Sequence, residues 1–416
     1  MNTYSPQRGQ HMLTVRRTLW TRLISAGFHK LLDRLDEGLA AGTIEAMLPD
    51  GSFRILGGRG AGPIAHLNVN RWRALFRLTR GGSVGGYKGW EKGEWDSPDL
   101  VPLFDLLMRN RATLGGAASA SGLVRLRTRL LHRLRRNDRK GAAKNIMAHY
   151  DLGNDFYRTW LDRTMSYSSA MFAVPINGEE RLEAAQKRKL SMLGKRLALA
   201  PQSSVLEIGF GWGTFSKLCA EKGHLVTAIT LSPSQKLWAE NHVAAARHQP
   251  DYRLCDYRDI AGHYDAIASI EMVEAVGAEY WPDYLDAITR LLKPGGRAAI
   301  QFIMIADDAF NAYVAHPDFI QSYIFPGGML ISESRFRALA EARGLTWEDP
   351  QHFGLHYAET LRRWRIRFDD AVEASRLPPG FDARFIRLWR FYLMYCEGGF
   401  RSGGINVTQV TLVKGQ

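Results

Sequence analysis

The fold of this 416-residue chain depends on the stretch Ser204-Val205-Leu206-Glu207-Ile208-Gly209-Phe210-Gly211-Trp212-Gly213-Thr214-Phe215. An apolar run with one internal carboxylate leads into glycines at every second position, and residues 215–223 continue with a helical pattern. This order predicts a buried parallel strand, a tight turn and the N-terminus of a helix. Glycines let the backbone approach a ligand closely, and the first amides of the helix point toward it. The stretch therefore predicts a ligand site at one edge of a parallel sheet.

The turn does not fit a dinucleotide-binding fingerprint. That fingerprint has its third glycine where this chain has Thr214, and it needs an acidic residue about 20 residues later to hold a ribose. The second predicted strand instead ends in Ala228-Ile229-Thr230-Leu231-Ser232. A Gly-x-Gly-x-Gly turn after an acidic strand resembles motif I of S-adenosylmethionine-dependent methyltransferases. A glycine turn in another kind of α/β domain is the alternative interpretation.

Composition places the chain among soluble proteins. It has three widely spaced cysteines without a metal-ligand pattern, which is typical of a reducing compartment. Residues 1–17 lack the apolar core of a signal peptide, and no apolar run is long enough to span a bilayer. We therefore expect a cytoplasmic protein without a metal, long enough for two or three domains.

The positive charge is concentrated in the first third of the chain. Residues 1–145 contain 25 Lys and Arg against 11 Asp and Glu, whereas the remainder is nearly neutral. The most basic segment, 123–140, has leucines at helical spacing (Leu123, Leu126, Leu130, Leu134) among eight Arg and Lys residues. Such a helix suits the inner face of an anionic membrane. A solvated helix between domains is the equally weighted alternative. Nucleic acid is disfavoured because the segment lacks aromatic residues for base stacking.

Three regions are expected along the chain. Residues 1–114 alternate helical and strand-like patterns, with a hairpin at 42–55, and predict a small α+β domain; the family resemblance given below implies that it is lipid-associated. Residues 115–144 combine a flexible linker with the basic helix. Residues 145–416 contain repeated strand–helix patterns, which predict an α/β methyltransferase domain with a Rossmann-like parallel sheet. An insertion is expected around 306–330, and the family resemblance given below implies that its residues Phe310, Tyr313, Phe319, Tyr323, Ile324 and Phe325 wall an acyl channel. Plain core packing is the alternative for the same residues, and the two roles can coincide.

Several motifs together resemble the cyclopropane-fatty-acyl-phospholipid synthase family. They include His149–Tyr157, Met165–Phe172, Cys255–Asp259, Glu271–Gly277, Leu292–Gly296, Tyr323–Gly328 and Cys396–Phe400 with Gln409, besides the glycine turn. The segment Gly86–Asp96 is similar to the N-terminal domain of the longer, phospholipid-acting members. The resemblance covers nearly the whole chain. It implies a methyltransferase that acts on the double bond of an unsaturated acyl chain, here expected in a phospholipid.

The resemblance and the strand-end positions indicate an S-adenosylmethionine site. The glycines would surround the methionine and ribose, polar residues after the second strand would reach the ribose, and a carboxylate and a ring after the third strand would bind the adenine. The expected cofactor-binding residues are Tyr167, Ser168, Glu207, Gly209, Gly211, Gly213, Thr230, Leu231, Ser232, Gln235, Asp256, Tyr257 and Ile270.

The chemistry that the resemblance implies needs a base. Methyl transfer to an alkene leaves a carbocation, and a base then removes a proton to give a cyclopropane or a branched alkene. In cyclopropane-forming relatives the base is bicarbonate, held by a glutamate, a tyrosine, a histidine and the loop around a cysteine. This chain has Glu274 and Tyr357 at two of these positions, but Gln301 and Ser169 at the other two.

The two substitutions argue against bicarbonate, and we expect a methyl-branched unsaturated product. Glu271 would share a face with Glu274 if that turn is helical; a solvent-facing or capping role is favoured for it and a catalytic role is the alternative. A methyltransferase of the same fold that acts on a soluble small molecule, and a nucleic-acid-binding methyltransferase or non-catalytic binding module, are the rival functions. Homodimer formation stays open.

Overall fold

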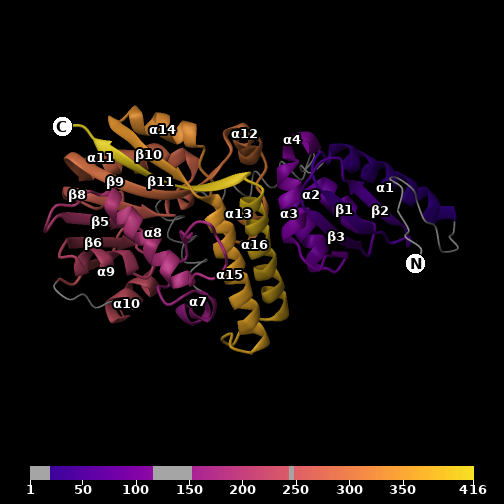
Figure 1. The fold of residues 1–416 in the computed structure, drawn as a ribbon, viewed down its shortest axis with the longest axis horizontal. Helices are drawn as coiled ribbons and strands as arrows, with labels where there is room; N and C mark the ends of the chain where they lie inside the picture. The colour runs from indigo at the N-terminus through magenta and orange to yellow at the C-terminus, as the bar shows by residue number, and fades with distance from the viewer. Residues whose placement is uncertain (1–18, 116–151, 243–247) are drawn as a thin grey trace. The chain divides into compact units, whose positions relative to one another are not determined.

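The computed structural model of the chain describes residues 19–115, 152–242 and 248–416, with side chains from residue 27 onward (Figure 1). The predicted basic helix and motif residues 149–151 lie outside the described residues. The described residues form two compact units: 152–314 with 323–381 and 405–416, and 19–115 with 315–322 and 382–404. The domain boundaries expected at 114 and 145 stay predictions. In the described ranges, no helix is long and apolar enough to cross a membrane, and no His, Cys, Asp and Glu cluster could hold a metal.

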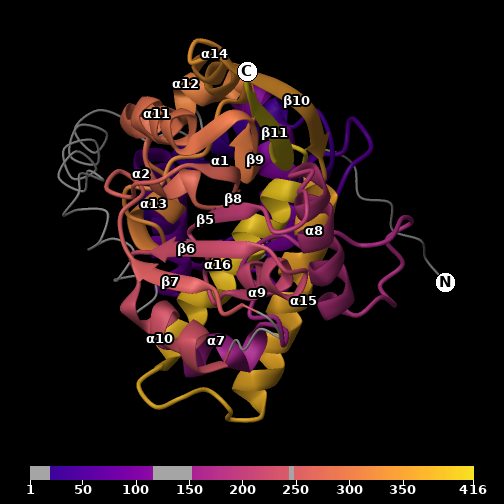
Figure 2. The same cartoon turned by 90° about the vertical axis from the view of Figure 1, so that its left-hand side faces the viewer.

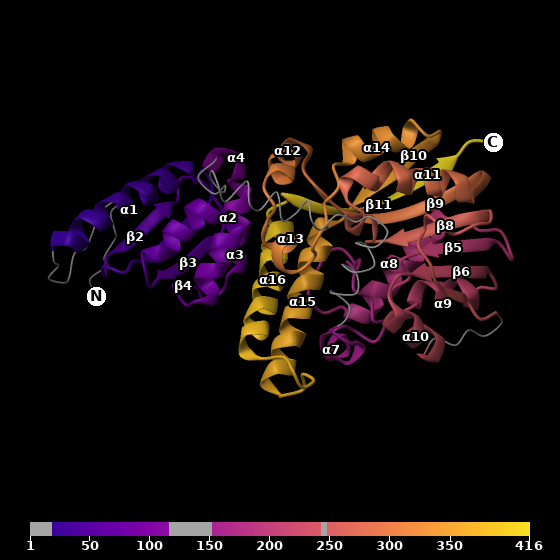
Figure 3. The same ribbon diagram turned by 180° about the vertical axis from the view of Figure 1, so that it is seen from behind.

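A seven-stranded sheet forms the centre of the larger unit and confirms the predicted α/β fold. Its strand order is β10-β11-β9-β8-β5-β6-β7, with β7 labelled in Figure 2 and the other strands also in Figures 1 and 3. The five strands from β9 to β7 run parallel, whereas β11 runs antiparallel between β9 and β10. The strands are β5 (Ser204–Ile208), β6 (Leu225–Thr230), β7 (Asp251–Leu254), β8 (Tyr264–Ile270), β9 (Leu292–Ile305), β10 (Leu345–His352) and β11 (Ile405–Lys414).

Two apolar cores lie on opposite faces of this sheet because successive strand residues point to opposite sides. Val205 packs with residues of α8 (Leu182–Arg196), α9 (Thr214–Glu221) and α10 (Pro233–His242). Leu206 and Ile208 pack on the other face with residues of α11 (Trp281–Leu291) and α14 (Glu333–Glu341). Figure 2 shows α8 and α11 on the two sides of the strands. Helices on both faces leave the carboxyl ends of the parallel strands as the place where ligands bind in such folds.

Further elements of the larger unit surround the strand ends. The helix α7 (Asn154–Trp160) packs against α15 (Gly354–Glu373), and two short 3-10 helices, η2 (Val273–Ala275) and η3 (Ala278–Tyr280), follow β8. The helix α12 (Asp307–Ala315) follows β9. Phe310 on α12 is buried against Trp281, with ring centroids 5.9 Å apart. This residue, predicted to wall an acyl channel, is therefore part of the apolar core on that side.

The smaller unit contains a four-stranded sheet with the order β2-β1-β3-β4. The hairpin predicted at 42–55 is confirmed, because β1 and β2 pair antiparallel across it. Phe319, another expected channel residue, is buried here against Tyr87 and Phe391. The elements are α1 (Leu19–Gly38), β1 (Thr43–Met47), β2 (Phe53–Gly57), β3 (Ile64–Val69), α2 (Arg73–Glu91), β4 (Trp95–Asp96), α3 (Val101–Arg109), α4 (Arg111–Leu114), α13 (Phe319–Tyr323, whose last residue belongs to the larger unit) and α16 (Ala383–Arg401).

Candidate active site

A cavity of the larger unit lies at the carboxyl ends of β5, β6, β7 and β8, where the fold predicts a ligand. The segment 165–168 and α8 complete its wall. Eleven of the thirteen expected cofactor-binding residues line it: Tyr167, Ser168, Glu207, Gly209, Gly211, Thr230, Leu231, Gln235, Asp256, Tyr257 and Ile270.

The three glycines of the turn have different surroundings. All three have positive φ angles, which side-chain-bearing residues rarely adopt. A Cβ atom on Gly211, which lines the cavity, would meet no atom within 4 Å, whereas one on Gly209 would lie 2.7 Å from Cγ of Met272. Gly213 does not line the cavity: a Cβ there would lie 3.0 Å from the Tyr252 hydroxyl, so this glycine permits close packing of α9. Its expected contact with the ligand stays a prediction.

Two polar residues expected to bind the cofactor have partners in the protein. Ser232 is buried outside the cavity lining, and its Oγ accepts a hydrogen bond from the Gln235 backbone at 3.3 Å in the first turn of α10. Asp256 does line the cavity, but the Arg258 guanidinium donates to both of its carboxylate oxygens, at 2.9 and 2.6 Å. Ser232 therefore stabilises a helix start, and Asp256 is held in a bidentate ion pair.

Glu207 contributes a carboxyl group to the cavity wall from the end of β5. The Ser216 hydroxyl donates a hydrogen bond to it. Burial raises the pKa of Glu207 to about 8, although the bonds from Ser216 and the charge of Lys189 oppose the rise. At neutral pH this carboxyl group therefore holds a proton and can donate as well as accept a hydrogen bond.

Four of the five expected catalytic residues meet at the carboxylate of Glu271. The Tyr357 hydroxyl donates to Oε2 at 2.7 Å. The other oxygen, Oε1, accepts from the Gln301 side chain at 2.8 Å and from the Ser169 backbone N–H at 2.9 Å. Glu271 also lines the cavity. The favoured sequence interpretation, a solvent-facing or capping carboxylate, is wrong because this side chain points inward to three donors.

The backbone at Glu271 shows that the condition for a face shared with Glu274, a helical turn, is not met. Its φ of 48° lies in the left-handed region, and only a 3-10 turn follows it. Such a conformation costs about 1 kcal/mol or more for a residue with a side chain. The cost is met by the Glu271 N–H, which donates to the Gln301 carbonyl at 2.7 Å, and by the three hydrogen bonds at the carboxylate. Strain of this kind is typical of functional sites.

Glu274 has the opposite environment although it is only three residues away. Its Oε1 accepts from the Ile303 backbone, and its Oε2 has no hydrogen-bond partner among the described residues. Desolvation and the nearby Glu271 charge raise the pKa of Glu274 to about 8. Desolvation also raises the pKa of Glu271, but three donors and the Lys189 charge oppose that rise. When one of the two groups is ionised, the three donors therefore favour the charge on Glu271 over Glu274.

Lys189 supplies a positive charge at the cavity that the sequence analysis missed. It is buried on α8, lines the cavity and donates to the Ser168 hydroxyl at 2.6 Å. Desolvation lowers the pKa of Lys189 to about 8, against the attraction of Glu271, Asp162 and Glu207. A sequence signal was present, because Gln186 and Lys189 fall on the face of α8 that is otherwise apolar.

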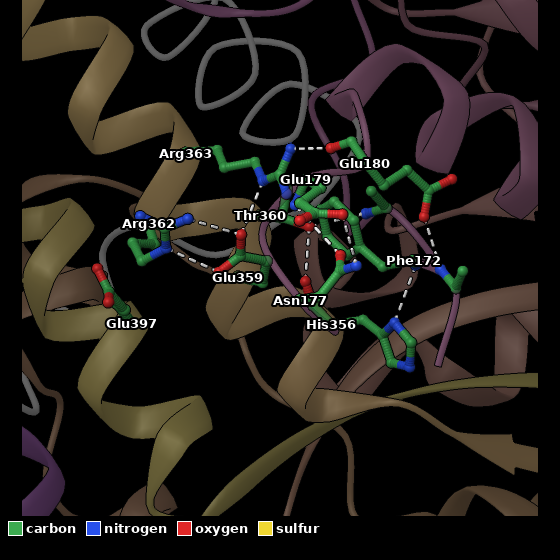
Figure 4. A network of polar contacts seen from close by, with 12 residues as sticks. Phe172, Asn177, Glu179, Glu180, His356, Glu359, Thr360, Arg362, Arg363 and Glu397 are labelled. Atoms are coloured by element: carbon green, nitrogen blue, oxygen red, sulfur yellow. Dashed lines mark hydrogen bonds and ion pairs between the residues drawn. The ribbon is translucent and has the colours of Figure 1, made fainter. Parts of the chain in front are cut away.

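The segment that carries Ser169 is fastened to α15, the helix that carries Tyr357. Figure 4 shows the Phe172 N–H facing Nδ1 of His356, at 2.9 Å. The Ala170 N–H donates to the Thr360 hydroxyl at 3.1 Å. Burial lowers the pKa of His356, which favours the neutral ring that can accept this bond. These contacts fix the spacing between the two donors that hold Glu271.

Comparisons with known proteins agree with this geometry. A family model described as mycolic acid cyclopropane synthetase matches residues 137–410. This chain belongs to that family. It is 40% identical over 368 residues to the tuberculostearic acid methyltransferase UfaA1 of Mycobacterium tuberculosis, covering 84% of this chain and 83% of the relative. It is 30% identical over 352 residues to the cyclopropane-fatty-acyl-phospholipid synthase of Escherichia coli K12, covering 84% and 88%.

Solved structures of the mycolic acid cyclopropane synthetase family support the same fold. The cyclopropane synthase CmaA1 complexed with SAH and CTAB has a TM-score of 0.59 and 28% identity, covering 65% of this chain and 98% of that chain. MmaA2 of Mycobacterium tuberculosis gives the same TM-score at 27% identity, covering 65% and 98%. The chain is thus an S-adenosylmethionine-dependent methyltransferase, as predicted. The open space at Gly211, the polar groups of Thr230 and Gln235 and the Tyr257 ring fit this co-substrate.

Aromatic rings extend the cavity wall of this family member. Tyr167 and Trp212 line the cavity. The Tyr167 ring lies 5.4 Å from Tyr157 and 5.3 Å from Trp364, and Trp212 lies 5.1 Å from Tyr157. Aromatic faces of this kind stabilise nearby cations. None of the six residues expected to wall an acyl channel lines the cavity described here, so that channel stays a prediction.

Proposed function

We propose that this enzyme transfers a methyl group from S-adenosylmethionine to the double bond of an unsaturated acyl chain in a phospholipid, and that Glu271 is the base. The product is a branched chain that keeps a double bond. The observation that carries the proposal is the Glu271 carboxylate, which lines the cavity while three donors hold it.

The hydrogen bonds leave one acceptor position on Glu271. A carboxylate has about four lone-pair positions. Oε1 receives donors from Gln301 and Ser169, and Oε2 receives one from Tyr357. The remaining lone pair of Oε2 is the place where a proton can be received. A base next to the reacting carbon contributes about 10²- to 10⁴-fold to rate.

S-adenosylmethionine supplies the electrophilic methyl group. The glycine turn and the strand ends hold it, while the apolar and aromatic wall excludes water from the reacting carbons. The alkene π electrons form the bond to the methyl carbon as the carbon–sulfur bond breaks, with its electron pair left on sulfur. The cation that results lies on the acyl chain, where the faces of Tyr167 and Trp212 stabilise it. Glu271 then takes one proton, and that C–H electron pair forms the new double bond.

An internal base removes the need for bicarbonate. The tyrosine position, the histidine position and the cysteine loop that the sequence analysis connected with bicarbonate are Tyr357, Gln301 and Ser169 here. All three donate to Glu271 instead. A second anion at the same donors would have to displace the Glu271 carboxylate and would be repelled by it. We therefore propose turnover that does not depend on bicarbonate.

Relatives support the substrate class and the branched product. The name of the 40% identical relative refers to tuberculostearic acid, a methyl-branched fatty acid, and that of the Escherichia coli relative refers to fatty acyl phospholipid. Phospholipid as substrate fits the predicted basic segment, and we propose peripheral binding to an anionic membrane on that basis.

A labelled donor tests the proposal. The purified enzyme is incubated with trideuteromethyl S-adenosylmethionine and vesicles of an unsaturated phosphatidylglycerol, in buffers depleted of and supplied with bicarbonate. We expect equal turnover in both buffers and a branched product with vinyl or vinylidene signals by NMR. Three retained deuteriums mean that the proton came from the chain, and two mean that it came from the methyl group after a hydride shift. Cyclopropane signals, or strict dependence on bicarbonate, would contradict the proposal.

A further inference from the structure

Two buried glutamines face each other in the middle of the large sheet. Gln301 on β9 and Gln409 on β11 are direct register partners, and neither exposes any surface. An amide buried in a sheet core is costly unless its donors and acceptor all find partners. The contacts of these two side chains therefore indicate what they do.

The two amides form one continuous chain of hydrogen bonds that ends at Glu271. Arg196 Nε donates to Gln409 Oε1 at 3.3 Å, and Gln409 Nε2 donates to Gln301 Oε1 at 3.0 Å. Gln301 Nε2 then donates to Glu271 Oε1 at 2.8 Å. The second N–H of each amide is also used, at the carbonyls of Lys189 (3.4 Å) and Ser169 (3.5 Å).

The groups at the two ends of this series of hydrogen bonds allow only one orientation of the two amides. A guanidinium has only hydrogen-bond donors, and an ionised carboxylate has only acceptors. Each glutamine amide has an NH₂ group that donates and a carbonyl oxygen that accepts. Other bonds hold the Arg196 guanidinium in place, to the Asp349 carbonyl at 2.7 Å and to Gln351 Oε1 at 3.2 Å. If Gln409 turned over, its NH₂ group would face the guanidinium and its carbonyl would face the Gln301 carbonyl. Gln301 would then turn over as well and present its carbonyl to Glu271.

We propose that Gln409 is a positioning residue that, with Arg196, holds the Gln301 amide with its NH₂ group toward Glu271 and so keeps the base ionised and oriented. This inference rests on the proposed function of Glu271. Other groups that face the carboxylate are Lys189 from α8, Tyr357 from α15 and Glu274 from the turn after β8. Their interactions with Glu271 do not pass through the Gln409 side chain, which itself bonds to Arg196, Gln301 and the Lys189 carbonyl.

The substitution Gln409→Glu tests whether the orientation of the hydrogen bonds between Arg196 and Glu271 matters. The new carboxylate would accept from Arg196 with one oxygen and present the other to Gln301, which must turn its NH₂ group away from Glu271. We expect the acidic limb of the pH profile of kcat/KM to move upward by at least about one pH unit. Below that limb, kcat/KM should fall about tenfold, while the Kd for S-adenosylmethionine is unchanged.

Gln351→Glu is the matched control. It places the same negative charge beside the same Arg196 guanidinium, but at an exposed position outside the series of amide hydrogen bonds. The pH profile of kcat/KM should therefore match that of the unmodified enzyme. Gln409→Met, which is apolar and of similar volume, covers the case in which Gln409→Glu does not fold. It should move the limb in the same direction by a smaller amount.

The outcomes separate this inference from the proposed function. If Glu271→Gln is inactive while both folded Gln409 variants keep the original pH profile, the positioning role of Gln409 is overturned and Glu271 is still supported as the base. If Glu271→Gln stays active with the usual profile, the proposed base fails, and with it the inference. An equal shift for Gln351→Glu would mean that surface charge, not the amide chain, sets the profile.

Discussion

At the scale of single residues, the main feature is a pair of carboxyl groups that differ in hydrogen bonding. Three donors hold Glu271, whereas Glu274 receives one backbone N–H and leaves Oε2 unpartnered among the described residues. Two carboxylates this close do not both ionise easily. Environments that push two pKa values apart give one group the role of base and leave the other protonated.

The first prediction compares Glu271→Gln with Glu274→Gln. Glu271→Gln removes the base and places an NH₂ group among three donors, so turnover should fall by about 10²- to 10⁴-fold. Glu274→Gln has nearly the shape and hydrogen-bonding groups of a protonated glutamate and should cause a much smaller loss. Single-turnover rates at saturating donor measure both. The reverse order would identify Glu274, the residue that the family resemblance favours, as the base.

The second prediction concerns Gly211. Gly211→Ala would place a methyl group in the open space of the cavity and should weaken S-adenosylmethionine binding at least tenfold by calorimetry. Gly223→Ala is the control, because Gly223 also has a positive φ and open surroundings but does not line the cavity. Both variants should lose about 1 kcal/mol of stability from backbone strain. Equal affinity in the two variants would place the ligand elsewhere.

At the scale of elements, α8 joins the sheet core to the cavity. Its apolar face packs on the sheet through Leu190 and Leu193, and the same face presents Lys189 to the cavity. The desolvation of this lysine disfavours the folded protein in exchange for a positive charge near Glu271. Burial of Lys189 on α8 therefore lowers the stability of the fold, but it gives the site a cation at a fixed position.

The third prediction is that Lys189→Met stabilises the fold and impairs the reaction. Below pH 8 the buried charge costs stability that the apolar side chain does not, so the variant should unfold at higher denaturant concentration. The pKa of Lys189 is lowered from 10.5 to about 8, so the folded protein binds fewer protons than the unfolded chain between these values. Stability of the unmodified enzyme relative to the variant should therefore rise across this window, by at most about 1.4 kcal/mol per pH unit.

The exposed Lys195 on the same helix provides the control for that experiment. Lys195→Met should change neither the unfolding curve nor kcat beyond the small effects usual for surface positions. In Lys189→Met, kcat at neutral pH should fall because Glu271 loses the charge that favours its ionised form. A variant that is both more stable and fully active would show that the lysine has no part in the reaction.

Elements also show what the sequence could and could not predict. Alternation of strands and helices is a local pattern, so the sheet, the glycine turn and the strand-end residues were predictable. The hydrogen bonds to Glu271 were not predictable, because the donors Tyr357 and Ser169 come from distant segments and the backbone at Glu271 departs from a helix. Gly213 looked like its two neighbours in sequence, and only packing against Tyr252 separates its role from theirs.

At the scale of the whole molecule, the charge distribution leads to the fourth prediction. Neutralising the arginines of 123–140 should weaken binding to anionic vesicles by up to about 1 kcal/mol per charge. Vesicle flotation at low salt measures this, and a nucleic-acid shift assay serves as the comparison. Methylation of a short-chain, soluble lipid substrate should be unaffected, because the cavity is unchanged. Undiminished flotation would support the solvated-helix alternative.

The position of β11 has a consequence for biosynthesis. This strand lies between β9 and β10, so β10 joins the sheet only after β11 has been translated, more than fifty residues later. The pocket for the methyl donor is built from β5 to β8 and emerges from the ribosome much earlier. Gln409, by contrast, arrives with β11. A nascent chain therefore contains all the strands that line the donor pocket well before it contains the amide that orients the base.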